Sequence, residues 1–334
     1  MKKQLLLLGI FILSISAVAQ NSTEFKASGK PFFDVHWNYH ADLTDGATQK
    51  SEFELKRAYL GYGYKFTEAI SAKVTIDVGN NDSGSAYTAY LKTAQLDWKV
   101  SSGVKLSMGL IGMKQFKTQE KFWGYRYIFK SFQDQYGFGS SADLGVNAEF
   151  KLASNLKANL TISNGEGYKK IQDSDGHQKI GAELVYTPIE GLTTKIYVDS
   201  QSAEDSDAVS AFSVFAGYNA SNWRLGAEYN KMSNATKYSS AAQDHELDGF
   251  SIFSTYVISK KVEVFARFDQ IGSNILSGES ETWNMSKDGN QVIAGLQVAP
   301  IKGLKFALNY QNFSFDDSSI NNKSLIYLNA QFKI

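Results

Sequence analysis

Apolar and polar residues alternate one by one along most of the chain. The segment 262–269 reads VEVFARFD and the segment 304–311 reads LKFALNYQ, and the same alternation recurs at 71–78, 156–163 and 223–230. A helix would repeat its apolar residues at every third and fourth position, whereas a strand points successive side chains to opposite faces. The pattern therefore predicts a chain built almost entirely of β-strands.

The connections between these strands alternate between short turns and long polar loops. The short turns are rich in Ser, Asn, Gly and Pro, and they lie at 67–70, 101–103, 153–156, 188–191, 220–222, 259–261 and 299–303. The long loops lie near 43–51, 79–85, 114–140, 165–177, 202–207, 233–246, 273–288 and 316–322. Short turns at one end and long loops at the other are typical of outer-membrane barrels. The count of connections predicts an all-β fold, an antiparallel β-barrel of about sixteen strands.

The last strand, SLIYLNAQFKI at 324–334, keeps the alternation up to the C-terminus. We expect it to pair with the first strand, FFDVHWNYHAD at 32–42, because a barrel in lipid must leave no strand edge open. The apolar face of such a barrel points outward to lipid and the polar face lines a watery interior. A soluble secreted all-β protein, with its apolar face inward, is the alternative.

Boundary aromatics favour the transmembrane barrel, whereas the charges on the polar face are compatible with both arrangements. Tyr62, Trp98, Trp223 and Tyr256 lie next to turns, where Tyr and Trp prefer the membrane–water boundary. The charges predicted to line the lumen wall are Lys73, Asp77, Arg224, Glu228, Arg267 and Asp269.

The first nineteen residues have the features of a secretory signal peptide. Lys2 and Lys3 precede an apolar run at 5–15, and Ala17-Val18-Ala19 resembles a cleavage site. The alternative is a buried N-terminal helix. We therefore expect a signal peptide at 1–19 and one outer-membrane barrel domain at 20–334, exported to the outer membrane of a Gram-negative bacterium. Its partners there would be outer-membrane lipid and small hydrophilic solutes.

Composition and motifs indicate that the chain performs no chemistry and needs no cofactor. The sequence has no cysteine and equal numbers of basic and acidic residues, so disulfides, thiolate metal sites and nucleic-acid binding are not expected. His36 and His40 would be about 13 Å apart on a strand, too far to share a metal ion. The stretch DSDG at 173–176 resembles a calcium loop only loosely, and we expect its acidic side chains to be solvated.

Several stretches resemble one porin family. FELKRAYLGYGYKF (53–66), AYLKTAQLDWKV (89–100), VKLSMGLIGMKQF (104–116), SADLGVNAEF (141–150) and LKANLTISNGEG (156–167) are similar, in order, to the phosphate-selective porin O and P family. The resemblance implies a sixteen-stranded porin that is commonly a homotrimer, with its third long loop folded into the lumen.

The third loop, at 114–140, is the longest and is full of aromatic residues. Such a loop should pack against the inner wall and narrow the pore; the alternative is a solvated extracellular loop. Its charges sum to +3, and a cationic constriction favours anions. The candidate constriction residues are Lys114, Lys117, Lys121, Arg126 and Lys130.

These features predict passive diffusion of small hydrophilic solutes or ions, with a preference for anions. Phosphate specificity is less favoured, because the chain has only four arginines and tight oxyanion sites need convergent Arg or Lys. One alternative is a receptor or adhesin barrel that works through its loops near 233–246 and 273–288. Another is an outer-membrane hydrolase, for which the sequence shows no motif.

Overall fold

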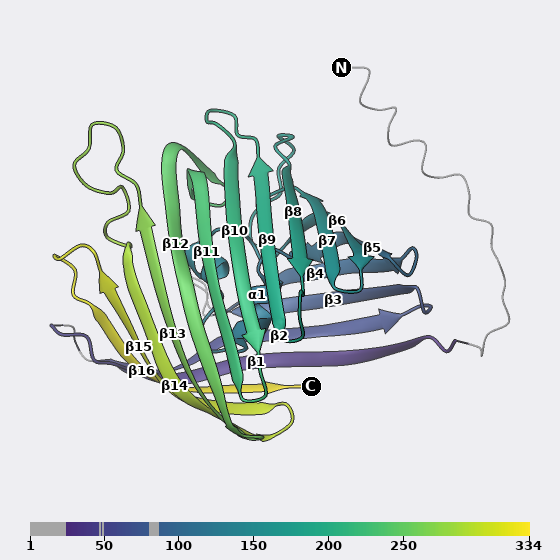
Figure 1. Ribbon diagram of the computed structural model, residues 1–334, viewed down its shortest axis with the longest axis horizontal. Helices are drawn as coiled ribbons and strands as arrows, with labels where there is room; N and C mark the ends of the chain where they lie inside the picture. Colours follow the sequence, from purple (N-terminus) through teal and green to yellow (C-terminus); the bar gives the residue numbers. More distant parts are fainter. Residues whose placement is uncertain (1–24, 47, 49, 80–86) are drawn as a thin grey trace.

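The chain forms a closed barrel of sixteen antiparallel strands, each paired with its neighbours in sequence. The computed structural model describes residues 25–46, 48, 50–79 and 87–334. The signal peptide predicted at 1–19 and most of the loop predicted at 79–85 lie outside the described residues. Within them, the predicted fold class is confirmed (Figure 1).

The strands run in chain order around the barrel. They are β1 (Ser28–Asp42), β2 (Ser51–Lys65), β3 (Ile70–Gly79), β4 (Thr88–Lys99), β5 (Val104–Gly112), β6 (Ala142–Ala153), β7 (Leu156–Ser163), β8 (Lys179–Tyr186), β9 (Leu192–Gln201), β10 (Val209–Asn219), β11 (Trp223–Lys237), β12 (Ser240–Ser259), β13 (Val262–Ser273), β14 (Gly289–Ile301), β15 (Leu304–Phe315) and β16 (Lys323–Lys333). Two short helices, α1 (Lys117–Trp123) and α2 (Phe132–Tyr136), lie between β5 and β6. Within the described part of the chain, no helix is both long and apolar enough to cross a membrane.

Strands β1 and β16 close the barrel, as the sequence predicts. They are antiparallel and in register from Asp34 opposite Lys333 to Asp42 opposite Leu325, and Figure 1 shows the C-terminus beside β1. On the inner face, the Gln331 side chain donates a hydrogen bond of 2.7 Å to the Asp34 carboxylate. Closure therefore rests on the backbone ladder and on polar side chains that bond across it.

Large apolar side chains cover the outer face and polar side chains fill the inner face. Leu308 and Leu328 are directly opposite each other on β15 and β16 and remain 57% and 44% exposed. One residue further on, Asn309 and Asn329 are buried and share a hydrogen bond of 2.7 Å. Because a water-soluble core buries apolar rather than polar groups, this arrangement is inverted, and the predicted outward direction of the apolar face is confirmed.

The prediction of a long loop at 233–246 is wrong. Strand β11 continues to Lys237 and β12 starts at Ser240, so the two form one extended hairpin. The ladder tolerates this polar stretch because backbone hydrogen bonds do not require apolar side chains. The pairing is irregular at this tip: the register shifts beside Ala235, and Asn234 and Asp244 have positive φ angles.

Candidate functional site

The connection between β5 and β6 packs against inward-facing residues of the barrel wall. This connection, residues 113–141, is called here the β5–β6 segment. Its helix α1 contacts β10 and β11, and Figure 1 shows α1 beside these strands. Its aromatic side chains form one buried cluster with wall residues from five strands. The members from the segment are Phe122, Trp123, Tyr125, Tyr127, Ile128 and Phe129, and those from the wall are Phe215, Phe253, Phe265, Ile293 and Ala307.

The ring contacts in this cluster are close. The ring centroids of Tyr125 and Phe265 are 4.3 Å apart, and those of Phe122 and Phe215 are 5.3 Å apart. Gly217 makes room for this packing, because a Cβ atom there would lie 2.5 Å from the Phe122 ring. Phe265 shares the inner face of β13 with the charged residues Glu263, Arg267 and Asp269, and this break in the alternation was the sequence signal for the docking surface.

Polar side chains of the wall fix the segment at several points. The Tyr125 hydroxyl donates a hydrogen bond of 2.7 Å to Glu263, and the Tyr127 hydroxyl donates one of 3.0 Å to Gln297. The fully buried Lys195 forms an ion pair of 2.7 Å with Glu183 and also donates to backbone and side-chain oxygens of the segment. The segment is therefore held by hydrogen bonds as well as by apolar contact.

Arg267 also holds the β5–β6 segment against the barrel wall. Its guanidinium makes two hydrogen bonds of 2.7 Å to the Asp269 carboxylate and one of 2.7 Å to the backbone oxygen of Lys130. Only 2% of Arg267 is exposed. The structure therefore brings Arg267 and Asp269 together as a buried pair that holds the segment, not as open charges on the wall.

The other predicted wall charges are also mostly paired or buried. Arg224 donates to the backbone oxygen of Trp123 at 3.4 Å and lies 3.8 Å from Glu263. Glu228 is buried and accepts a hydrogen bond from Asn230. Lys73 is exposed and lies over the ring of Phe32 at 4.7 Å.

Four of the five predicted constriction cations pair with carboxylates. The pairs are Lys114 with Glu149 at 3.4 Å, Lys117 with Glu120 at 3.4 Å, Arg126 with Glu120 at 3.4 Å and with Asp134 at 3.0 Å, and Lys130 with Asp134 at 3.6 Å. Lys121 is exposed and takes part in none of the ion pairs found among the described residues. Glu149 adds a third carboxylate to the two in the segment, so the five cations keep an excess of two positive charges instead of the predicted three.

Asp134 stays ionised in this setting. Burial favours its neutral form, but the nearby positive charges of Arg126 and Lys130 outweigh burial and hold the pKa of Asp134 below its usual value. The carboxylate thus ties the two cations to α2, because each lies within ion-pair distance of it.

A second group of cations lies on the wall formed by β2 to β4 and the loop after β7, and the sequence reasoning missed it. The Lys92 ammonium lies over the ring of Tyr59 at 4.6 Å and that of Tyr168 at 5.1 Å, and it donates to the Tyr59 hydroxyl at 3.2 Å. Lys169 lies over the ring of Tyr90 at 5.0 Å. We call this group the tyrosine–lysine cluster; its members are Arg57, Tyr59, Tyr90, Lys92, Tyr168 and Lys169.

Two strand irregularities add cations to the barrel interior. In the pairing of β1 with β2, His36 is opposite Arg57 and Trp37 is opposite Leu55, so Lys56 has no partner. In the pairing of β3 with β4, Lys92 is skipped in the same way. Such a bulge breaks the strict alternation of faces, so Lys56 reaches the backbone oxygen of Ile128 in the segment, at 3.1 Å. Strict alternation in the sequence could not locate these two lysines.

Asp77 lies at the edge of the tyrosine–lysine cluster. It pairs with Arg57 at 3.2 Å and accepts a hydrogen bond of 2.5 Å from the Tyr168 hydroxyl. It therefore connects the loop after β7 to the wall, and it balances one of the three cations in the cluster.

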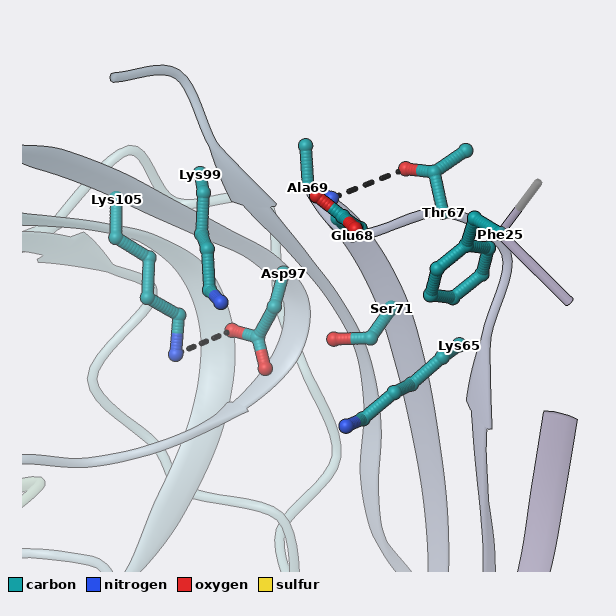
Figure 2. A pocket seen from close by; sticks show the side chains of 9 residues that line it. All are labelled: Phe25, Lys65, Thr67, Glu68, Ala69, Ser71, Asp97, Lys99 and Lys105. Carbon is teal, nitrogen blue, oxygen red and sulfur yellow. Dashed lines mark hydrogen bonds and ion pairs between the residues drawn. The ribbon is translucent and has the colours of Figure 1, made fainter. Parts of the chain in front are cut away.

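A separate cavity of about 390 Å³ lies at the turn between β2 and β3, on the short-turn end of the barrel (Figure 2). Lys65, Lys99 and Lys105 line it together with Asp97 and Glu68. Figure 2 shows the Lys105 ammonium pointing to Asp97, at 3.2 Å. This end of the barrel therefore carries a lysine-rich rim.

Solved structures of outer-membrane channels have the same fold. The outer membrane channel DcaP of Acinetobacter baumannii is 12% identical, with a TM-score of 0.68 over 95% of this chain and 100% of that chain. OmpF of Salmonella typhi is 11% identical, with a TM-score of 0.69 over 92% and 97% of the two chains. The anion-selective porin from Comamonas acidovorans is 11% identical, with a TM-score of 0.67 over 92% and 100%. No known protein-family model matches the sequence, and no curated protein matches it. The chain therefore has the fold of outer-membrane porins.

Proposed function

We propose that this protein is a porin of the outer membrane of a Gram-negative bacterium, through which small hydrophilic solutes and ions diffuse passively. The observation that carries the proposal is the inverted barrel, with exposed leucines outside and hydrogen-bonded asparagines inside. In lipid every backbone group must be paired within the protein, and a closed barrel meets this requirement. Export would use the signal peptide at 1–19, and the mature barrel would span 20–334. No enzymatic step is part of the proposal.

The β5–β6 segment narrows the passage in this proposal. Its side chains bond to inward-facing residues of β13 and β14, while Lys56 of β2 reaches it from another part of the wall. Solutes would then pass between the segment and the tyrosine–lysine cluster. Lys121 of the segment is exposed and adds a further positive charge.

Anions are the preferred ions in this proposal. The tyrosine–lysine cluster holds three cations, of which Arg57 is paired with Asp77, so Lys92 and Lys169 leave a net positive charge. An excess of one sign in a narrow passage selects the opposite sign. The similarity in fold to an anion-selective porin agrees with this preference, but the proposal rests on the charges of the cluster.

A phosphate site is disfavoured within this proposal, although the sequence resembles the phosphate-selective porin O and P family. Each of the four arginines lies within 4 Å of a carboxylate, in the pairs Arg57–Asp77, Arg126–Asp134, Arg224–Glu263 and Arg267–Asp269. A guanidinium already bonded to a carboxylate is not free to make the two-pronged contact that phosphate binding uses. We therefore propose a general preference for small anions. The resemblance also favours a homotrimer.

Recording from the purified protein in planar bilayers tests the proposal. We expect stepwise conductance and, in a KCl gradient, a reversal potential that indicates greater permeability to chloride than to potassium. The double variant Lys92→Gln/Lys169→Gln should lower the chloride-to-potassium permeability ratio. Lys302→Gln, which changes an exposed lysine in the turn between β14 and β15, is the matched control and should leave the ratio unchanged. Bilayers that stay tight to ions would refute the porin function, and an unchanged ratio in the double variant would refute the role of the cluster.

A further inference from the structure

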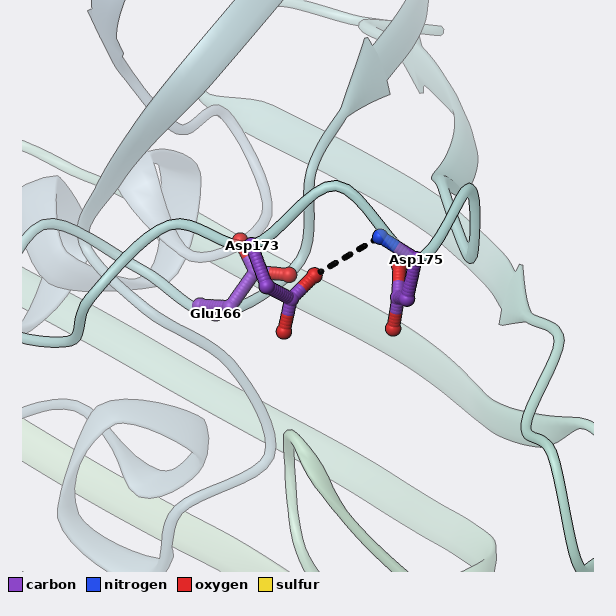
Figure 3. Close-up of side chains that lie close together, drawn as sticks. All are labelled: Glu166, Asp173 and Asp175. Carbon is purple, nitrogen blue, oxygen red and sulfur yellow. Dashed lines mark hydrogen bonds between the residues drawn. The ribbon is translucent and has the colours of Figure 1, made fainter.

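Three carboxylates converge in the loop between β7 and β8, residues 164–178. Glu166, Asp173 and Asp175 each offer an oxygen atom within 4.8 Å of the others, and Figure 3 shows their side chains close together. They line a cavity of about 180 Å³ together with Asn164 and Ser174. Asp173 and Asp175 are exposed, as the sequence suggested, whereas Glu166 beside them is only 9% exposed.

The backbone of the loop is built to hold Glu166 in place. The amide groups of Gly165 and Gly167, on either side of it, donate hydrogen bonds of 2.7 Å and 3.2 Å to the Asp143 carboxylate. Gly167 has a φ of +83°, a value that side chains other than glycine's rarely adopt. These contacts hold the backbone on both sides of Glu166.

Glu166 lacks a partner for its charge. It is only 9% exposed, and its Oε2 atom is buried with no hydrogen-bond donor. A buried carboxylate oxygen without a donor is costly, and no ion pair among the described residues supplies a cation to these carboxylates.

Lys169 and Lys170 are in the same loop but do not pair with the three carboxylates. The Lys169 ammonium lies over the rings of Tyr90 and Tyr168, at 5.0 Å and 5.8 Å. Lys170 is exposed, and neither lysine forms an ion pair with Glu166, Asp173 or Asp175 within the described part of the chain. The described residues therefore supply no cation to these three carboxylates.

We propose that Glu166, Asp173 and Asp175 bind one calcium ion. Calcium takes oxygen ligands at about 2.3–2.6 Å, so two ligands on opposite sides of the ion lie about 5 Å apart. Carboxylate oxygens that all lie within 4.8 Å of one another can therefore reach one calcium ion. Magnesium demands near-ideal octahedral geometry and gives up its waters reluctantly, so a site of this kind suits it less. Asn164 and Ser174 line the same cavity and offer neutral oxygen atoms to complete the coordination.

Calcium binding would stiffen the loop that carries Tyr168 and Lys169 to the tyrosine–lysine cluster. Tyr168 follows Glu166 by two residues and donates its hydroxyl proton to Asp77 on β3. The ion would thus steady two members of the cluster. This consequence for permeation depends on the proposed porin function, whereas the calcium site itself does not.

Isothermal titration calorimetry of the full chain in detergent, after treatment with EDTA, tests the site. We expect CaCl₂ to bind at one equivalent, with a dissociation constant of about 10⁻⁴–10⁻³ M, as in other extracellular calcium modules. MgCl₂ should bind at least about tenfold more weakly, because magnesium demands near-ideal octahedral geometry and dehydrates reluctantly.

Variants locate the ion. Glu166→Gln should weaken calcium binding at least about tenfold, and so should Asp175→Asn, which changes an exposed residue and keeps the fold in case Glu166→Gln unfolds the loop. Glu204→Gln, at an exposed position in the loop after β9, is the matched control and should bind calcium like the unchanged protein. The proposal is wrong if no saturable calcium binding occurs below about 10 mM, or if both loop variants bind calcium as the control does. Because the readout is binding, failure here is distinct from failure of the conductance test.

Discussion

Removing the ring of Phe265 should release the β5–β6 segment from the barrel wall. Phe265 points inward from β13, is almost fully buried, and lies 4.3 Å from the Tyr125 ring and 5.9 Å from the Trp123 ring, between centroids. Phe265→Ala deletes these contacts and leaves a cavity between wall and segment. It does not touch the hydrogen bond from Tyr125 to Glu263, so the segment keeps part of its anchor.

The expected loss is about 3–5 kcal/mol, the usual cost of replacing a buried phenylalanine by alanine. About 1 kcal/mol of this comes from the aromatic pairs. Since each 1.4 kcal/mol is a factor of ten in an equilibrium constant, the balance between docked and released segment should shift by at least about 100-fold toward release. A released segment no longer narrows the passage.

Two measurements detect the release of the segment. Single-channel conductance should rise in Phe265→Ala, and trypsin should cleave the segment faster after Arg126, whose side chain is only 18% exposed in the docked state. The matched control is Phe268→Ala. Phe268 is on the same strand but on the outer face, where it is 37% exposed. Its replacement should change neither the conductance nor the rate of trypsin cleavage.

An unchanged conductance and unchanged protease resistance in Phe265→Ala would refute the reasoning. The reasoning would also fail if Phe268→Ala opened the channel as much as Phe265→Ala, because the effect would then come from the stability of the strand and not from the docking surface.

Two further predictions concern the outer face and acid sensitivity. Leu308→Lys should destabilise the barrel in lipid vesicles by about 2–4 kcal/mol if the outer face meets the middle of the bilayer, and urea unfolding in vesicles measures this; a change below about 0.5 kcal/mol would contradict the assignment of the faces. The pKa of Asp134 is lowered in the folded protein, so its contribution to segment docking is fully present above the unfolded value of about 3.9 and is lost as the pH falls through the lower folded pKa. Trypsin sensitivity of the segment should therefore be constant from pH 8 to pH 5, and conductance should rise on acidification below about pH 4. In Asp134→Asn this acid-dependent rise should disappear, and a rise of the same size would show that another group is responsible.

The alternation of single residues determined the barrel architecture. A period of two is a local property, so each strand shows its apolar and polar faces without knowledge of its neighbours. The short turns and long loops then predicted a barrel of about sixteen strands, and the closing pair of β1 with β16 followed from the need to leave no edge. The tip of the β11–β12 hairpin was predicted as a long loop because its polar residues show no alternation, although its backbone still forms a ladder.

Only the tertiary structure decided which charges remain free. Arg267 and Asp269 are two residues apart and share a face, so the sequence places them correctly on the inner wall. Their burial depends on the β5–β6 segment, whose docking requires Phe215, Phe253 and Phe265 from three different strands. The bulges at Lys56 and Lys92 likewise arise from the register between neighbouring strands, and register is a property of the pair rather than of either sequence. Charge selection in a narrow passage depends on groups that meet from distant parts of the chain, and a local pattern does not contain that information.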